Sequence, residues 1–122
     1  MTTQVVLLTI TILIMNSDRK VYARINVSSS GDTTLVSAPD AGAHIEIDHI
    51  NILPSGGANV VSLKDGASTT IVDYALDDNQ LVALDLPKGN PMELSAATAF
   101  IINLGSATKV TGFVAYRIVG EA

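Results

Sequence analysis

Apolar and polar residues alternate in short runs along this chain, and clusters of Gly, Pro, Ser, Asn and Asp separate the runs. Alternation with a period of two is typical of β-strands, and no helical periodicity persists for three turns. The breaks, such as 28–32, 54–57 and 87–91, recur at a spacing that favours a sandwich or barrel over alternating strands and helices. After residue 20 the pattern predicts strands at 21–27, 33–36, 44–53, 59–63, 69–74, 81–86, 92–95, 99–104 and 109–119.

Two of these predicted strands carry further information. In 44–53 the four isoleucines occupy odd positions before Asp48 and even positions after His49. Because successive side chains of a strand point to opposite faces, one extra residue is needed there to keep all four on the core side. This predicts a β-bulge, or a strand that crosses between two sheets, near Asp48. In 109–119 neither face is strongly polar, which predicts a central strand or one covered by another subunit.

The most apolar stretch precedes these strands, at residues 5–15 (VVLLTITILIM). As a helix it would be only about 16 Å long, too short for the roughly 30 Å hydrocarbon core of a membrane. No basic residue precedes it, as one would in a signal peptide. Its β-branched residues favour an extended arm or strand that is covered on both faces. Either a neighbouring subunit provides that cover, or the stretch is an interior strand of the chain's own sandwich.

These patterns together predict an all-β chain with two parts. Residues 1–18 form an N-terminal apolar arm or extra strand, and residues 19–122 form a single antiparallel β-sandwich domain. A domain of this length buries enough surface to fold without disulfides or a structural metal.

The composition supports contact with partners. Hydrophobic residues make up 48% of the chain and charged residues only 16%, and the mean hydropathy is +0.39. That is apolar for a soluble monomer of this size, so we expect subunit contacts to cover part of the aliphatic surface. The net charge of −5 argues against binding to nucleic acid or to anionic lipid. The absence of cysteine excludes disulfides and thiolate metal sites.

Candidate chemistry is sparse. His44, Glu46 and Asp48 follow each other at every second residue, which suits a metal site or the solvent-exposed face of a half-buried strand. We expect these side chains to lie on a solvent-exposed face, because the predicted bulge would turn Asp48 away from Glu46. The acidic stretch 73–85 is either a cation-binding loop or a solvated loop, and we expect the latter.

No signature of an enzyme emerges. The chain lacks the Gly-x-Ser-x-Gly nucleophile motif and a phosphate-binding loop, and the spacing of His44 and His49 departs from that of metal-binding cupins. We therefore expect no catalytic, cofactor or metal site and no enzymatic activity. The basic cluster beside the arm is either a docking patch for an acidic partner or ordinary surface charge. We expect the interaction residues to be the apolar side chains of the arm and this basic cluster. They are Val5, Leu7, Ile10, Ile12, Ile14, Arg19, Lys20 and Arg24.

The segment 24–36 (RINVSSSGDTTLV) resembles the opening of a family of small structural proteins of tailed phage virions. The run 45–53, the segment 59–66 ending in Lys-Asp-Gly and the closing GFVAY at 112–116 are also similar, so the likeness covers about residues 24–119. The resemblance implies a jelly-roll β-sandwich, often trimeric, on the outside of the particle. Head decoration (cement) proteins are the closest type, and they bring no catalytic residues with them.

On this basis we expect a bacteriophage capsid decoration protein. It would bind the outer surface of the capsid as a homotrimer and stabilise the head by bridging subunits of the major capsid protein, with no cofactor, nucleic acid or membrane involved. The alternative is a tail-fibre or adhesin module that binds a host glycan or protein. The low aromatic content, 4%, disfavours sugar binding.

Overall fold

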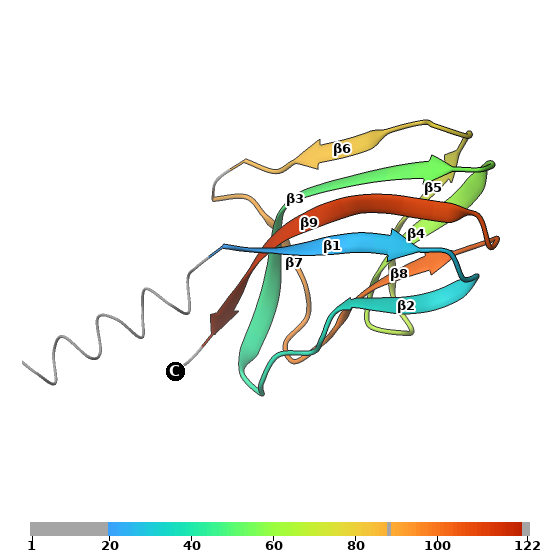
Figure 1. Cartoon of the computed structure of the whole chain (residues 1–122). Helices are drawn as coiled ribbons and strands as arrows, with labels where there is room; N and C mark the ends of the chain where they lie inside the picture. The colour runs from blue at the N-terminus through green and yellow to red at the C-terminus, as the bar shows by residue number, and fades with distance from the viewer. Residues whose placement is uncertain (1–19, 88, 121–122) are drawn as a thin grey trace, which may run out of the picture.

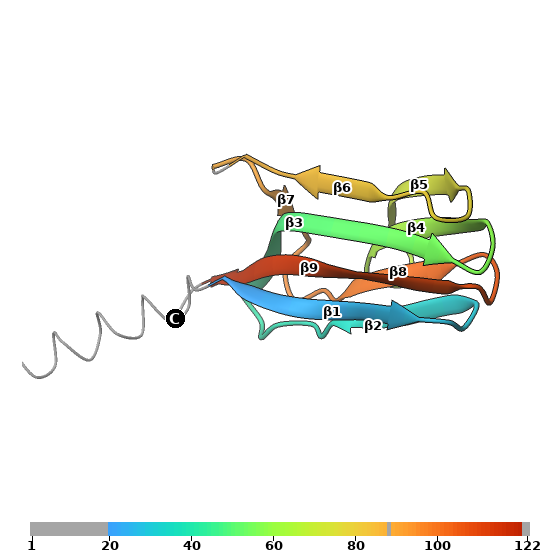
Figure 2. The ribbon, with the colours of Figure 1, turned by 45° about the horizontal axis from the view of Figure 1, so that its top comes forward.

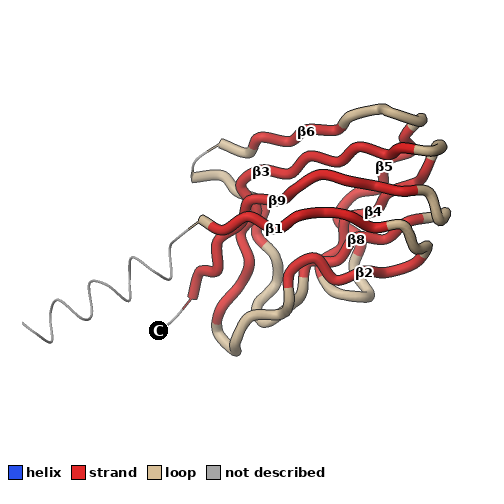
Figure 3. Tube along the Cα trace, viewed as in Figure 1, coloured by secondary structure: helices blue, strands red, loops and turns tan. Residues whose placement is uncertain are grey.

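The computed structural model describes residues 20–87 and 89–120, which form two antiparallel sheets packed face to face (Figures 1 and 2). Figure 3 shows these residues as strands and loops, with no helix among them. Every strand predicted after residue 20 is present, with each end within two residues of its expected position. The strands in this part of the chain are β1 (Val21–Val27), β2 (Gly31–Val36), β3 (Ala43–Ser55), β4 (Asn59–Asp65), β5 (Thr70–Leu76), β6 (Val82–Asp85), β7 (Met92–Glu93), β8 (Phe100–Leu104) and β9 (Lys109–Gly120).

The strand order is that of a jelly roll. Sheet A has the order β1-β9-β3-β6, with the short β7 also pairing with β3, and sheet B has the order β2-β8-β4-β5. The chain passes back and forth between the two sheets, as in the paired Greek keys of this fold. The sequence-based expectation of an antiparallel, jelly-roll-like β-sandwich is confirmed.

The core lies between the sheets and is almost wholly aliphatic. Because side chains alternate along each strand, every second residue of the long strands β3 and β9 points inward. Phe100 is the one aromatic ring among the fully buried side chains of the described ranges. The largest fully buried residues are Phe100, Ile25, Ile45, Ile47, Ile50, Ile52, Leu63, Ile102, Leu104, Val61, Val110 and Val114.

The predicted bulge in β3 is confirmed. Ile47 pairs with Tyr116 and His49 pairs with Ala115, so Asp48 is an extra residue opposite β9. The register shift brings the isoleucines on both sides of Asp48 to the core face, and all four are fully buried. The central position expected for the last strand is also confirmed, since β9 lies between β1 and β3.

The predicted arm, with Val5, Leu7, Ile10, Ile12, Ile14 and also Arg19, lies outside the described residues. Both sheets are built from strands between residues 21 and 120, and in each sheet the successive strands are hydrogen-bonded to one another. The described strands by themselves have the strand order of a jelly roll. For the described ranges, no helix has the length and apolarity needed to cross a membrane.

One glycine is fixed by the packing of β9 on β3. Gly112 has a φ of +150°, and a Cβ added there would lie 2.0 Å from the backbone oxygen of Asn51. We predict that Gly112→Ala lowers the free energy of unfolding by about 3 kcal/mol or more, because backbone atoms must move apart. Urea denaturation followed by circular dichroism measures this loss.

Gly31→Ala is the matched control. Gly31 also has a positive φ, +91°, but no atom lies within 4 Å of its added Cβ. Its cost should be only the conformational strain, about 1 kcal/mol. Equal losses in the two variants would contradict the role of close strand contact at Gly112.

Candidate functional site

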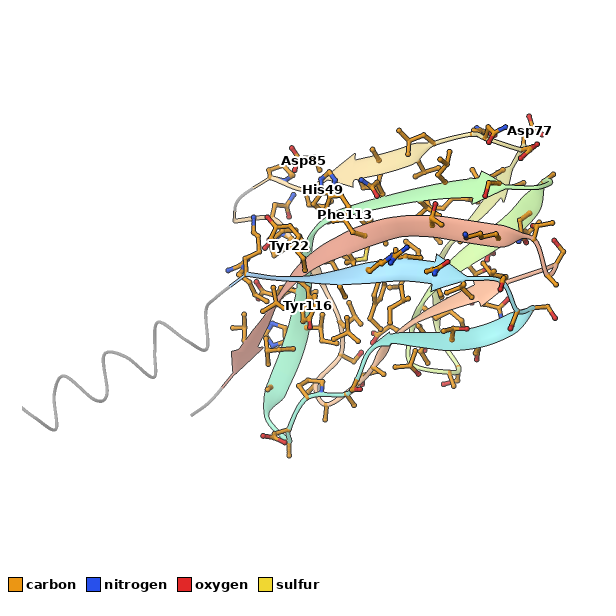
Figure 4. The ribbon with its side chains drawn as sticks, in the orientation of Figure 1. Tyr22, His49, Asp77, Asp85, Phe113 and Tyr116 are labelled. Atoms are coloured by element: carbon orange, nitrogen blue, oxygen red, sulfur yellow. The ribbon has the colours of Figure 1, made fainter. Side chains whose placement is uncertain are left out.

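The outer face of sheet A carries a line of three ring side chains and one carboxylate that crosses four strands (Figure 4). Phe113 of β9 lies in the middle, with ring centroids 5.9 Å from Tyr22 of β1 and 5.2 Å from His49 of β3. The His49 ring is stacked on Phe113 at 21°, and its Nδ1 lies 3.5 Å from a carboxylate oxygen of Asp85 in β6. We call Tyr22, Phe113, His49 and Asp85 the aromatic row.

The backbone register holds the aromatic row in place. Ala115 pairs with Tyr22 on one side and with His49 on the other, and it is almost fully buried although it points outward. The larger side chains around this small residue therefore cover it. The side-chain oxygen Oδ1 of Asn51 accepts a hydrogen bond from the backbone N–H of Phe113 at 3.0 Å. This bond links β3 to β9 at the position of Phe113. Tyr22 remains 66% exposed, so the row ends in a free apolar ring that can contact a partner.

A second group of side chains lies on the same face and is held by Arg117 of β9. Its guanidinium donates to both carboxylate oxygens of Asp48, at 2.9 and 3.1 Å, and to Oε1 of Glu46 at 3.1 Å. On the other side of Glu46, His44 Nε2 lies 2.8 Å from Glu46 Oε2 and 3.2 Å from Glu93 Oε1. We call His44, Glu46, Asp48, Glu93 and Arg117 the polar cluster.

Strand pairing explains how the polar cluster forms. Glu46 of β3 is directly opposite Arg117 in β9 and directly opposite Glu93 in β7. Cross-strand neighbours of this kind have adjacent side chains. Neither Arg117 nor Glu93 was expected from the sequence, because only the pairing of distant strands brings them to Glu46.

The prediction that His44, Glu46 and Asp48 lie on a solvent-exposed face is wrong. Asp48 is only 8% exposed, and the side chain of Glu46 is 14% exposed. The bulge does not separate Asp48 from Glu46 either, since both accept hydrogen bonds from the same guanidinium. Burial is tolerated because each carboxylate has a charged partner.

Lys20 and Arg24, expected as part of a basic docking patch, are both exposed. Arg24 pairs in register with Phe113, so it lies beside the aromatic row, and it forms no ion pair with any residue of 20–87 or 89–120. A positive charge next to exposed rings suits contact with an acidic partner. The docking patch itself stays a prediction.

The acidic stretch 73–85 is spread over the molecule. Asp73 accepts a hydrogen bond from Ser62 on the outer face of sheet B, and Asp85 belongs to the aromatic row of sheet A. Asp78 accepts hydrogen bonds from the backbone of Gly56 and Gly57 at the end of β3. These carboxylates therefore have separate structural partners and do not converge on one point.

The outer face of sheet B carries a group of hydrogen-bonded polar side chains. Asp32 accepts a hydrogen bond from Asn103 at 2.7 Å and is contacted by the amino group of Lys64 at 3.1 and 3.2 Å. The Asn103 hydrogen bond and then the Lys64 ammonium hold the pKa of Asp32 below its usual value of 3.8. Among the described residues, this face has no pair of contacting rings like those of the aromatic row, but it exposes two large apolar side chains, Val60 and Ile71.

No family model matches the sequence, and no curated protein sequence matches it. Solved structures do. A chain in the acidic stable capsid structure of Helicobacter pylori bacteriophage KHP30 aligns with 84% of this chain and 93% of its own length, with 14% identity and a TM-score of 0.55. This is a similarity of fold, and it shows that the chain has a viral capsid-like β-sandwich.

Two further similarities are weaker. A chain of the extra small virus (XSV) particle of the giant freshwater prawn Macrobrachium rosenbergii has 17% identity and a TM-score of 0.43, with 85% of this chain and 79% of that chain covered. The C-terminal domain of EclA, a sugar-binding protein, has 20% identity and a TM-score of 0.40, with 84% and 79% covered.

The Arg117 ion pairs yield a stability prediction. Arg117→Met leaves the largely buried carboxylate of Asp48 without its bidentate partner, so we expect a loss of about 3 kcal/mol in the free energy of unfolding. The control Lys64→Met removes an ion pair to the more exposed Asp32 and should cost much less. Adding Asp48→Asn to Arg117→Met should recover part of the loss. Similar small losses for Arg117→Met and Lys64→Met would contradict the assignment.

A second prediction concerns acid stability. Because the pKa of Asp32 is lowered in the folded state, its contribution to stability is present above the usual value of 3.8 and is lost as pH falls through the lowered pKa. Asn103→Ala should raise the pKa of Asp32 towards 3.8, as measured by carbon NMR of the carboxyl group. An unchanged pKa in this variant would show that the Asn103 hydrogen bond is not the main cause.

Proposed function

We propose that this chain is a bacteriophage capsid decoration protein that binds the outer surface of the head as a homotrimer and bridges subunits of the major capsid protein. The observation that carries the proposal is the match of an entire jelly roll to a chain of a phage capsid, over 84% of this chain and 93% of the other. The two chains are thus of similar length and consist mainly of this one domain. The sequence resemblance over residues 24–119 supports the same role.

The distribution of apolar surface also supports the proposal. The described strands bury most of their own aliphatic side chains, but some large apolar residues of the described ranges are exposed. They are Val21, Tyr22, Val60, Ile71 and Leu81. Val21 and Tyr22 come shortly after the predicted arm, whose residues 5–15 are the most apolar stretch of the chain. The domain therefore exposes large apolar side chains on both sheets, and a bound partner would cover them.

Decoration would act through binding alone. A protein that binds the assembled shell and not its free subunits shifts the equilibrium towards the shell. Many copies on a repeating lattice add avidity without any new kind of contact. We assign no catalytic reaction to the chain.

The test is deletion of residues 1–18. We expect the deleted protein to keep its β-rich circular dichroism spectrum, because all the strands of the described jelly roll lie after residue 20. Trimer formation, measured by analytical ultracentrifugation, or co-sedimentation with phage shells lacking this protein should be weakened. Unchanged assembly and unchanged shell binding would contradict the role of the arm.

A second candidate function is an adhesin that binds a host glycan or protein. The aromatic row favours it, since an exposed tyrosine beside a stacked ring pair and a carboxylate suits the face of a sugar. The same sedimentation experiment separates the two functions when host surface material replaces the shells. Binding to that material without binding to shells would favour the adhesin.

A further inference from the structure

We propose that His44, Glu46 and Glu93 of the polar cluster form a site for Zn²⁺ or a similar transition-metal ion. One ligand atom from each residue lies within 4.8 Å of the other two. His44 Nε2 is 2.8 Å from Glu46 Oε2 and 3.2 Å from Glu93 Oε1. In a tetrahedral zinc site the ligand atoms lie about 3.3 Å apart, so small side-chain rotations would open a space of the right size.

The ligand types select the class of metal. An imidazole nitrogen with two carboxylate oxygens suits Zn²⁺ and its neighbours in the first transition row. Mg²⁺ and Ca²⁺ take oxygen ligands and would make poor use of His44. Glu93 is 64% exposed, so one side of the site is open to water, which can supply a fourth ligand.

The charge balance of the polar cluster favours a bound cation. The polar cluster contains three carboxylates and the single positive charge of Arg117, which contacts Glu46 and Asp48, while Glu93 contacts His44. With a neutral His44 the group has a net charge of −2, which a divalent ion would neutralise.

Arg117 also orients a ligand. It holds Oε1 of Glu46, while Oε2 of the same carboxylate faces His44. The guanidinium thus fixes the direction of Oε2, as outer-shell partners do in metalloproteins, and a bound metal would replace the contact between Oε2 and His44 Nε2.

The site would join β7 to β3. β7 has only two residues and lies in the connection that leads from β6 in sheet A to β8 in sheet B. Backbone hydrogen bonds from Leu94 to Ile45 and from Ala97 to Ala43 already hold this connection. A metal shared by Glu93 and the two β3 residues would add a cross-link at the same place, whether or not the chain decorates a capsid.

The test uses the full-length protein without an affinity tag. Titration with Co²⁺ should produce the visible absorption of a tetrahedral site, and isothermal calorimetry with Zn²⁺ should show one ion per chain. Zn²⁺ should also raise the melting temperature. Glu93→Gln, in an exposed side chain, and His44→Gln should each weaken binding by at least about tenfold.

His49→Gln is the control, because His49 lies on the same face but has a single carboxylate neighbour, Asp85. It should bind Zn²⁺ as the unmodified chain does. The proposal is overturned if neither metal binds at millimolar concentration. It is also overturned if Glu93→Gln and His44→Gln, shown to be folded by circular dichroism, bind Zn²⁺ with unchanged affinity.

Discussion

The extra residue at Asp48 is the constraint on which sheet A depends. β3 is the longest strand of the described structure and pairs with β9, β6 and β7. Without the bulge, the isoleucines on one side of Asp48 would turn to solvent. Burial of each such side chain contributes roughly 1.5–3 kcal/mol, which is a large share of the roughly 5–15 kcal/mol that stabilises a small domain. The same bulge brings Asp48 beside Arg117, so one local feature determines both the core and the polar cluster.

Much of the fold could be predicted because its signals are local. Alternation, turn residues and the change of parity at Asp48 lie within single segments, and each gave the correct element. The register between strands is different, since it depends on packing between residues far apart in the chain. Glu46 and Arg117 are 71 residues apart, and no pattern near either residue indicates the other. For this reason the sequence suggested a solvent-exposed face at Glu46 and Asp48, where the structure has a largely buried ion-pair network.

The aromatic row was missed for the same reason. Tyr22, His49 and Phe113 come from three different strands, and each reads as an isolated ring in the sequence. The low aromatic content of the chain argued against a ring-lined surface. Strand order places these few rings on one face of sheet A, so their position matters more than their number.

The proposed function rests on the jelly-roll fold and on the apolar side chains that the described strands and loops leave exposed. The most direct test of the proposed decoration role is a cryo-electron microscopy reconstruction of phage particles assembled with this chain. The account predicts jelly-roll density on the outside of the head, at three-fold positions of the lattice and in contact with the major capsid protein. A head without such density, or jelly-roll density confined to the tail, would contradict it.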